Sequence, residues 1–152
     1  MRPVLVQLRD ETGEGASFYR KEAGARVCLF REDPNRPLRG HMPEGSLLPL
    51  DKGASGRVLT QFEDALGNQQ QLNQLLTSLP FVSLGEWAKE LGSIAAPVFW
   101  AQRGLAGAIG LSGPITRFTP DAIAEMAPAL LRAARTLSDA LGGSRYWAGL
   151  PE

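Results

Sequence analysis

The chain has 152 residues, of which 43% are hydrophobic and 21% are charged, and its 16 basic and 16 acidic side chains cancel. This length fits one domain that buries its core without disulfides or metals. The composition excludes collagen, coiled coils and full disorder, and no apolar run approaches the roughly 20 residues of a membrane span. Without a basic run, the chain alone is not expected to bind DNA.

The first residues predict a helix. Val4, Leu5 and Leu8 recur at helical spacing, Pro3 suits the first turn, and Gly13 suits the end. The segment resembles the last turns of a longer helix, so we expect the chain to be a piece of a longer protein.

Three short strands are predicted next. The first two, Ala16–Lys21 and Arg26–Arg31, are joined by a predicted hairpin, and a third is predicted over Pro37–Met42. In the second strand, Cys28 and its neighbours alternate between two faces. The following segment, Gly45–Pro49, predicts a loop.

The middle of the chain predicts two helices and three more strands. Lys52–Phe62 is predicted to be a short helix, and the Gln-rich segment Asp64–Leu79 a helix with a solvated face. Pro80–Leu84 predicts a short strand. The most apolar segments, Ser93–Trp100 and Gly104–Ser112, predict two buried strands joined by a hairpin loop.

The last predicted element is a long helix. Thr119–Asp121 supplies a cap, a first-turn proline and a carboxylate near the positive helix end, whereas Gly142 stops the helix. Pro128 predicts a kink. The apolar face consists of Ile123, Met126, Leu130, Ala134, Leu137 and Leu141. The order of elements predicts an α+β (or α/β) fold, an antiparallel sheet with helices on its faces.

No arrangement of residues predicts catalysis or a metal site. Cys28 would need a base, and the only histidine is His41, so a small buried thiol is the simpler interpretation. One cysteine and one histidine cannot close a zinc site without two carboxylates. Glu86 and Glu90, one helical turn apart, are interpreted as a solvated pair. Nucleotide-binding loops and nucleophile elbows are missing from the sequence, so neither an enzyme nor a cofactor is expected.

The sequence favours a binding pocket. Pro49–Gly56 brings small residues to the start of a helix, whose free N–H groups accept a carboxylate well, although the glycines would equally suit a plain turn. Ser93 and Ser112 are polar positions in apolar strands. Such serines are usually bonded to backbone carbonyls, but two that face one cavity would suit a small polar ligand.

Four segments occur in an order and spacing that resemble a known family. They are Leu48–Leu59, Ser83–Glu86, Ser93–Phe99 and Ala108–Phe118. Together they are similar to the C-terminal effector-binding domain of IclR-family bacterial transcriptional regulators, over most of the chain. The resemblance implies a GAF-like fold: a curved antiparallel sheet of about six strands, with helices on one face and a ligand cavity on the other.

The resemblance also implies how the protein works. Residues 1–152 would form a single effector-binding domain, without the winged helix-turn-helix domain that holds operator DNA at the N-terminus of family members. The effector would be a small organic acid or an aromatic compound, acting through the arrangement of a homodimer or homotetramer. Contact with DNA would be made only through the missing domain. No membrane contact is expected, and the lone Cys28 fits a reducing cytoplasm.

Carried over by position, the resemblance implies eight ligand-binding residues. Ala54 and Ser55 would contact a carboxylate at the helix start, and Leu48 and Leu91 would form an apolar wall. The remaining positions are Ser83, Ser93, Gly110 and Ser112. Acid-binding members carry Asp, Cys and Ser where this chain has Ser83, Ser93 and Gly110. We therefore hypothesise a ligand larger or less polar than a two- or three-carbon acid.

Two other functions stay open: a GAF-like sensor that acts outside transcription, and an enzyme that uses Cys28 and His41. Subunit contacts could use the apolar face of the long helix and a tail, expected to be exposed, that contains Trp147. Ordinary packing against the sheet would explain both features equally well.

Overall fold

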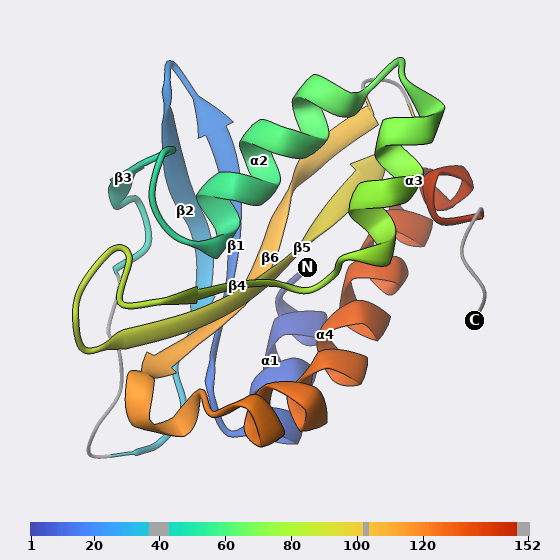
Figure 1. Cartoon of the computed structure of the whole chain (residues 1–152). Coiled ribbons are helices and arrows are strands. Elements are labelled where there is room, and N and C mark those ends of the chain that lie inside the picture. The colour runs from blue at the N-terminus through green and yellow to red at the C-terminus, as the bar shows by residue number, and fades with distance from the viewer. Residues whose placement is uncertain (37–42, 102–103, 149–152) are drawn as a thin grey trace.

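A computed structural model of the protein describes residues 1–36, 43–101 and 104–148. Six antiparallel strands form one sheet in the order β3-β2-β1-β6-β5-β4 (Figure 1). The strands are β1 (Gly15–Glu22), β2 (Ala25–Glu32), β3 (Leu47–Pro49), β4 (Phe81–Leu84), β5 (Leu91–Trp100) and β6 (Gly104–Pro114). The helical elements are α1 (Arg2–Thr12), α2 (Ala54–Ala65), α3 (Gln69–Thr77), η1 (Ile115–Arg117), α4 (Pro120–Ala140) and η2 (Ser144–Trp147). The predicted α+β class is confirmed.

Helices cover both faces of the sheet. α1 and α4 pack against each other and on one face, whereas α2 lies across β4, β5 and β6 on the other (Figure 1). Strand β5 shows the effect of this double cover, because Ile94–Phe99 is buried without the alternation of a strand that has one solvated face. Phe62 of α2 packs against Phe81 and Phe99, with ring centroids 5.6 and 6.0 Å apart, and so fixes α2 to the sheet.

Helix α4 forms as its sequence predicts. The Thr119 hydroxyl accepts a hydrogen bond from the Ala122 N–H at 3.2 Å, and the helix continues through Pro128 to Ala140. Four residues of its apolar face are buried, namely Met126, Leu130, Ala134 and Leu137. This face packs on the sheet, as the simpler of the two interpretations expects.

The tail that contains Trp147 exposes Ser144, Arg145 and Ala148, but Trp147 itself is buried, so the prediction is wrong for the side chain that was to make the subunit contact. Trp147 is 5% exposed and packs edge-on against Phe99, with ring centroids 5.9 Å apart. Its Nε1 donates to the Ser138 hydroxyl at 3.0 Å, and the N–H of Phe99 donates to the same oxygen at 2.9 Å. The tail therefore joins α4 to β5 and closes the core.

The third strand differs from its prediction. Pro37–Met42 lies outside the described residues, and the strand beside β2 is β3, within the segment predicted as a loop. Leu48 of β3 pairs with Arg26 of β2. A three-residue edge strand is held by main-chain hydrogen bonds and needs no alternating pattern, which is why the sequence did not indicate it.

The helix predicted from Asp64 also begins later. Gly67, at a φ of 92°, separates α2 from α3, and the Asn68 side chain then caps α3 by accepting from the Gln71 N–H at 3.1 Å. Within the described residues, no helix has the length and apolar character required to cross a membrane.

Candidate functional site

The register of the sheet brings three serines together. Ser83 of β4 pairs with Ser93 of β5, which in turn pairs with Ser112 of β6. Directly paired residues point to the same face, so the three side chains form a polar row across neighbouring strands. Gly110, two residues before Ser112, lies on the same face and leaves space above the sheet.

A cavity of about 40 Å³ lies over this row at the start of α2. Its polar lining residues are Tyr19, Arg26, Ser55, Ser83, Ser93 and Ser112, and its glycine and apolar ones are Gly53, Trp87, Leu91, Gly92, Ile94, Gly110 and Leu111. Six of the eight residues that the resemblance implies line this cavity: Ser55, Ser83, Leu91, Ser93, Gly110 and Ser112.

The other two residues do not line the cavity. Leu48 packs into the core from β3, and Ala54 is fully buried in the first turn of α2. The cavity has room for a few water-sized groups. Its size therefore does not support the hypothesis of a ligand larger than a three-carbon acid.

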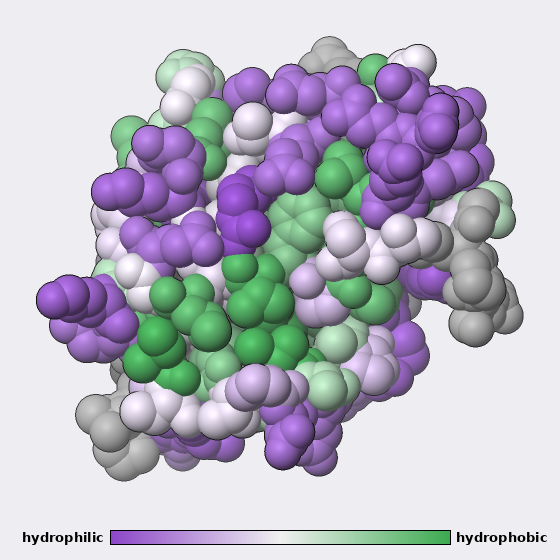
Figure 2. Space-filling model, viewed as in Figure 1, coloured by the Kyte–Doolittle hydropathy of each residue, from purple (hydrophilic) through white to green (hydrophobic). Residues whose placement is uncertain are grey.

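Apolar side chains surround the mouth of the cavity. Figure 2 shows them gathered over β4 and the turn that follows it. Leu84 is 50% exposed, and Trp87, which lines the cavity, is 43% exposed. Glu86 and Glu90 lie in this turn and not on a helix, so they do not form a pair one helical turn apart. Glu86 instead pairs with Arg57 at 3.1 Å.

Arg26 of β2 fills the space between the sheet and the start of α2. Its Nε donates to the carbonyl of Pro49 at 3.0 Å, and its Nη2 donates to that of Lys52 at 3.1 Å. Its Nη1 donates to the Ser55 hydroxyl. Gly53 leaves room for this side chain, since a Cβ there would lie 2.9 Å from Nη2. Only 4% of Arg26 is exposed, so its charge lies in the cavity wall.

The groups around Arg26 are neutral. Burial lowers the pKa of Arg26, and the ionisable groups that oppose this shift are Tyr19 and Cys28. Burial raises the pKa of both of these groups, so at pH 7 neither carries a charge. The Arg26 guanidinium carbon lies 5.2 Å from the centre of the Tyr19 ring. In the part of the chain that the structure describes, no carboxylate pairs with Arg26.

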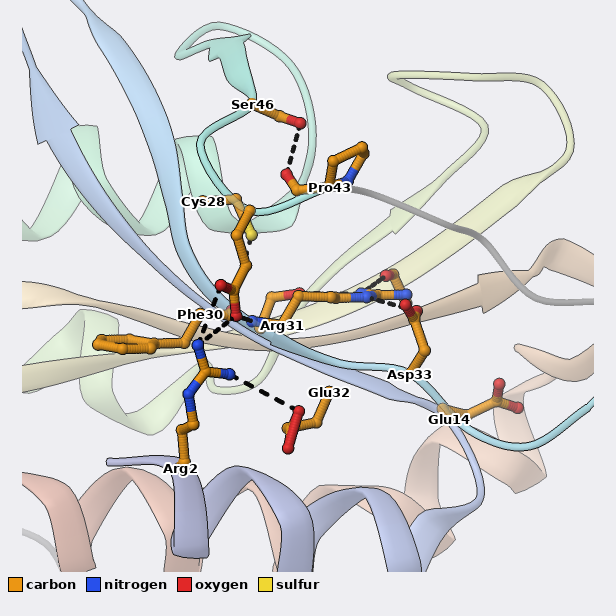
Figure 3. A network of polar contacts seen from close by, with 12 residues as sticks. Arg2, Glu14, Cys28, Phe30, Arg31, Glu32, Asp33, Pro43 and Ser46 are labelled. Carbon is orange, nitrogen blue, oxygen red and sulfur yellow. Dashed lines mark hydrogen bonds and ion pairs between the residues drawn. The ribbon is translucent and has the colours of Figure 1, made fainter.

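Arg31, at the other end of β2, is a second buried arginine, and its charge is paired. Its Nε donates to Asp33 Oδ1 at 2.9 Å, and Figure 3 shows the two side chains pointing toward one another. Its Nη1 donates to the hydroxyls of Ser17 at 2.9 Å and Ser112 at 2.7 Å. Gly15 permits this reach, because a Cβ there would overlap the guanidinium. Arg31 thus positions Ser112 without lining the cavity.

Three residues at or beside the cavity were not predicted from the sequence: Tyr19, Arg26 and Arg31. Charged residues at the ends of a strand usually reach solvent, and the alternation around Cys28 did not indicate that both arginines turn inward. One local signal existed for Arg31, since Asp33 follows it by two residues. For Arg26, the partners are 23 to 29 residues away along the chain.

The structure gives no support to cysteine catalysis. Cys28 is fully buried, its raised pKa keeps the thiol protonated, and His41 lies outside the described residues. Among the residues that the structure describes, no group of three or more His, Cys, Asp and Glu side chains is placed to hold a metal ion.

Known bacterial transcriptional regulators resemble this chain in sequence and in fold. The sequence profile described as bacterial transcriptional regulator IclR C-terminal matches residues 80–139, from the start of β4 to the end of α4. The chain is 28% identical over 142 residues to the glycerol operon regulatory protein of Streptomyces griseus, covering 78% of this chain and 54% of that protein. It is 24% identical to the HTH-type transcriptional regulator BhcR of Paracoccus denitrificans, covering 90% and 57%. The chain thus spans about half the length of these relatives.

The fold agrees with these sequence matches. The crystal structure of the Thermotoga maritima IclR superposes with a TM-score of 0.80 at 18% identity, covering 93% of this chain and 66% of that chain. Both reported relatives are named as regulatory proteins. Profile, relatives and fold together show that this chain is similar to the C-terminal domain of IclR-family bacterial transcriptional regulators.

Proposed function

We propose that residues 1–152 form an effector-sensing domain and that the cavity over the serine row binds a small organic molecule. The observation that carries this proposal is that six of the eight residues implied by the resemblance line one cavity at the start of α2. Buried serine hydroxyls, a cationic side chain and apolar walls in a single concave site are typical of small-molecule sites.

The bound effector would act at a distance. In the whole regulator, operator DNA would be held by a winged helix-turn-helix domain N-terminal to this one. The regulator would act in the reducing cytoplasm, where the lone Cys28 needs no disulfide partner. An effector that binds one subunit arrangement more tightly than another shifts the balance between them, with a coupling of typically about 1–3 kcal/mol. Helix α1 packs on both the sheet and α4, so it is the element through which a change in this domain would reach that neighbour.

We expect the domain to associate as a homodimer or homotetramer. The end of β4 and the turn after it support this, because Leu84 and Trp87 expose apolar surface three residues apart in the chain. Replacement of Leu84 by Glu should lower the oligomeric state, measured by light scattering after size-exclusion chromatography. An unchanged mass for Leu84→Glu would place the subunit contact on another surface.

A thermal-shift screen tests effector binding. The domain would be screened against carboxylic acids, aromatic compounds and neutral small molecules. A ligand at about 100 times its dissociation constant adds about 2.7 kcal/mol, which raises the melting temperature by several degrees for a domain of this size. Two variants that fill the cavity, Ser112→Leu and Ser93→Leu, should abolish the shift, whereas Ser144→Leu on the exposed surface should retain it.

Ser93→Leu is the sharper of the two cavity variants. Ser112 accepts from Arg31, so its replacement also disturbs that arginine, whereas Ser93 makes no hydrogen bond with the described side chains. A compound that raises the melting temperatures of the wild type and of both cavity variants equally binds outside this cavity. A broad panel without any shift would count against effector sensing by this domain.

A further inference from the structure

The turn between β4 and β5 is attached to the rest of the domain by few polar contacts. It spans residues 85–90, and Figure 1 shows it projecting beyond the end of β4. Its base is closed by a hydrogen bond from the Gly85 N–H to the Leu91 carbonyl at 2.8 Å. From residue 86 to residue 89, no main-chain N–H donates a hydrogen bond within the described part of the chain. Segments with few hydrogen bonds open at a low cost in free energy.

Trp87, in the middle of this turn, covers the cavity. It lines the cavity and is 43% exposed, so its indole lies between the interior and solvent. The enclosed volume of about 40 Å³ holds a few water-sized groups. A larger compound therefore enters only when Trp87 moves outward, and the segment that carries Trp87 is the loosely attached one.

An ion pair joins the turn to another wall of the cavity. Arg57 lies in the first part of α2, the helix whose Ser55 belongs to the lining. Its Nη2 donates to the carbonyl of Val82 on β4 and, at 3.1 Å, to Glu86 Oε2 in the turn. The guanidinium carbon also lies 5.8 Å from the centre of the Phe81 ring. Arg57 is thus held on β4, and Glu86 is the partner that moves with the turn.

The ion pair is weak enough to break and form again. Both side chains are partly exposed, Arg57 at 34% and Glu86 at 40%. Exposed ion pairs contribute little to stability, and salt screens them. The pair of Arg31 and Asp33 differs in this respect, because only 2% of the Arg31 side chain is exposed. The contact between Arg57 and Glu86 therefore holds the turn in place without fixing it permanently.

We infer that residues 85–90 form a gate over the cavity, with Trp87 as its cover and the ion pair of Arg57 and Glu86 as its latch. This inference rests on the proposed effector site and describes how that site is entered. Gly85 provides a hinge at the start of the gate, because glycine accepts the φ of 76° found there and many other backbone conformations. Opening breaks the contact with Glu86 and leaves Arg57 on β4.

A thiol inside the cavity measures the gate without any effector. The parent protein for this test carries Cys28→Ala, which removes the native thiol, and Ser93→Cys in the lining. Its reaction with methyl methanethiosulfonate is followed by mass spectrometry from pH 7 to pH 9, which separates a change in thiol pKa from a change in access. Cys28→Ala combined with Ser144→Cys reports an exposed thiol. We expect the cavity thiol to react at least about tenfold more slowly than the exposed one.

Charge variants of Glu86 identify the latch. Added to the parent, Glu86→Gln should raise the rate about two- to fivefold, the range that loss of an exposed ion pair allows. Glu86→Lys places a like charge beside Arg57 and should raise the rate further. Sodium chloride at 1 M should accelerate the parent by a similar factor and leave Glu86→Gln nearly unchanged. The matched control is Glu63→Gln, which breaks the exposed pair of Lys21 and Glu63 and should react like the parent.

Removal of the cover should have the largest effect. Trp87→Ala is expected to raise the rate of the parent about tenfold, because the cavity then opens to solvent. Adding Glu86→Gln to Trp87→Ala should change the rate no further, since the latch acts only through the cover. If Trp87→Ala does not fold, the Glu86 series and the salt dependence still decide the question.

The gate is wrong if the cavity thiol reacts as fast as the exposed one, if neither Glu86 variant changes the rate, or if Glu63→Gln accelerates the reaction equally. Trp87 also belongs to the surface proposed for subunit contacts, so the rates are measured at two protein concentrations. Protection that disappears on dilution would assign the cover to a second subunit and would also overturn the gate. These rates need no effector, so the gate can fail while the thermal-shift screen finds ligands. An empty screen counts against effector sensing and leaves the rates unaffected.

Discussion

The two ends of β2 handle a buried arginine in opposite ways. At Arg31 the chain supplies Asp33 and two serine hydroxyls, and the guanidinium becomes part of the architecture. At Arg26 it supplies two carbonyls and one hydroxyl, all neutral. Among the described residues, one buried arginine thus has a carboxylate partner, whereas the other has only neutral hydrogen-bond acceptors.

The comparison also explains the geometry around each arginine. Gly15 clears the path by which Arg31 crosses β1 to reach Ser112, so this end of the sheet is tied together across three strands. Gly53 clears a similar space at the start of α2, but there the guanidinium faces a cavity. One end of β2 thus carries a cross-strand hydrogen-bond network, and the other lines the proposed effector cavity.

The largest expected effect is on stability at the paired end. Arg31→Gln leaves the largely buried Asp33 carboxylate without its guanidinium, and breaking such a pair from one side costs about 3 kcal/mol of unfolding free energy. Urea denaturation of the variant measures this cost. Arg20→Gln, which removes an exposed ion pair, should change stability by less than about 0.5 kcal/mol. Equal costs for the two variants would contradict a structural role for Arg31.

The second expected effect is on the reactivity of Cys28, which lies on β2 between the two arginines. The thiol is fully buried and burial raises its pKa, so both access and thiolate fraction are low. We expect a disulfide reagent at pH 8 to label the native domain about a hundredfold more slowly than the urea-unfolded chain. Labelling at similar rates would show that this part of the sheet opens readily.

The third effect concerns the unpaired end without a ligand. Arg26→Gln removes a buried charge and three hydrogen bonds but leaves no carboxylate behind, so the two contributions partly offset each other. We expect a loss of about 1 kcal/mol or less in urea, well below the loss for Arg31→Gln. A cost equal to that of Arg31→Gln would mean that the fold already satisfies the charge of Arg26.

The smallest effect is a pH dependence at the paired end. The pKa of Glu44 lies below its ordinary value of 4.5, because its carboxylate accepts from the Arg31 N–H and from Arg2. A carboxylate with a lowered folded-state pKa stabilises the fold above pH 4.5, and this contribution is lost as the pH falls through the folded-state value. The melting temperatures of wild type and Glu44→Gln should therefore differ at pH 6 and converge near pH 3. If the two melting temperatures still differ at pH 3, the titration of Glu44 is not the cause of the difference.

Hydrophobic spacing predicted most of the fold. The apolar positions of α4, β5 and β6 specify their elements locally, and the serine positions implied by the resemblance do meet on one face. Strand β3 was missed because main-chain pairing alone holds it. The burial of Arg26 could not be predicted, since its hydrogen-bond partners lie 23 to 29 residues away along the chain and leave no local pattern.

The most direct test observes both arginines in one experiment. The Nε–H resonances of Arg26 and Arg31 can be assigned in nitrogen-15 spectra from the Gln variants, and the wild type then titrated with propanoate and with propanamide. We predict a saturable shift of the Arg26 resonance with the acid, none with the amide, and a nearly constant Arg31 resonance. Binding of propanoate that leaves the Arg26 resonance unchanged, or that shifts the Arg31 resonance instead, would contradict the proposed effector cavity beside Arg26.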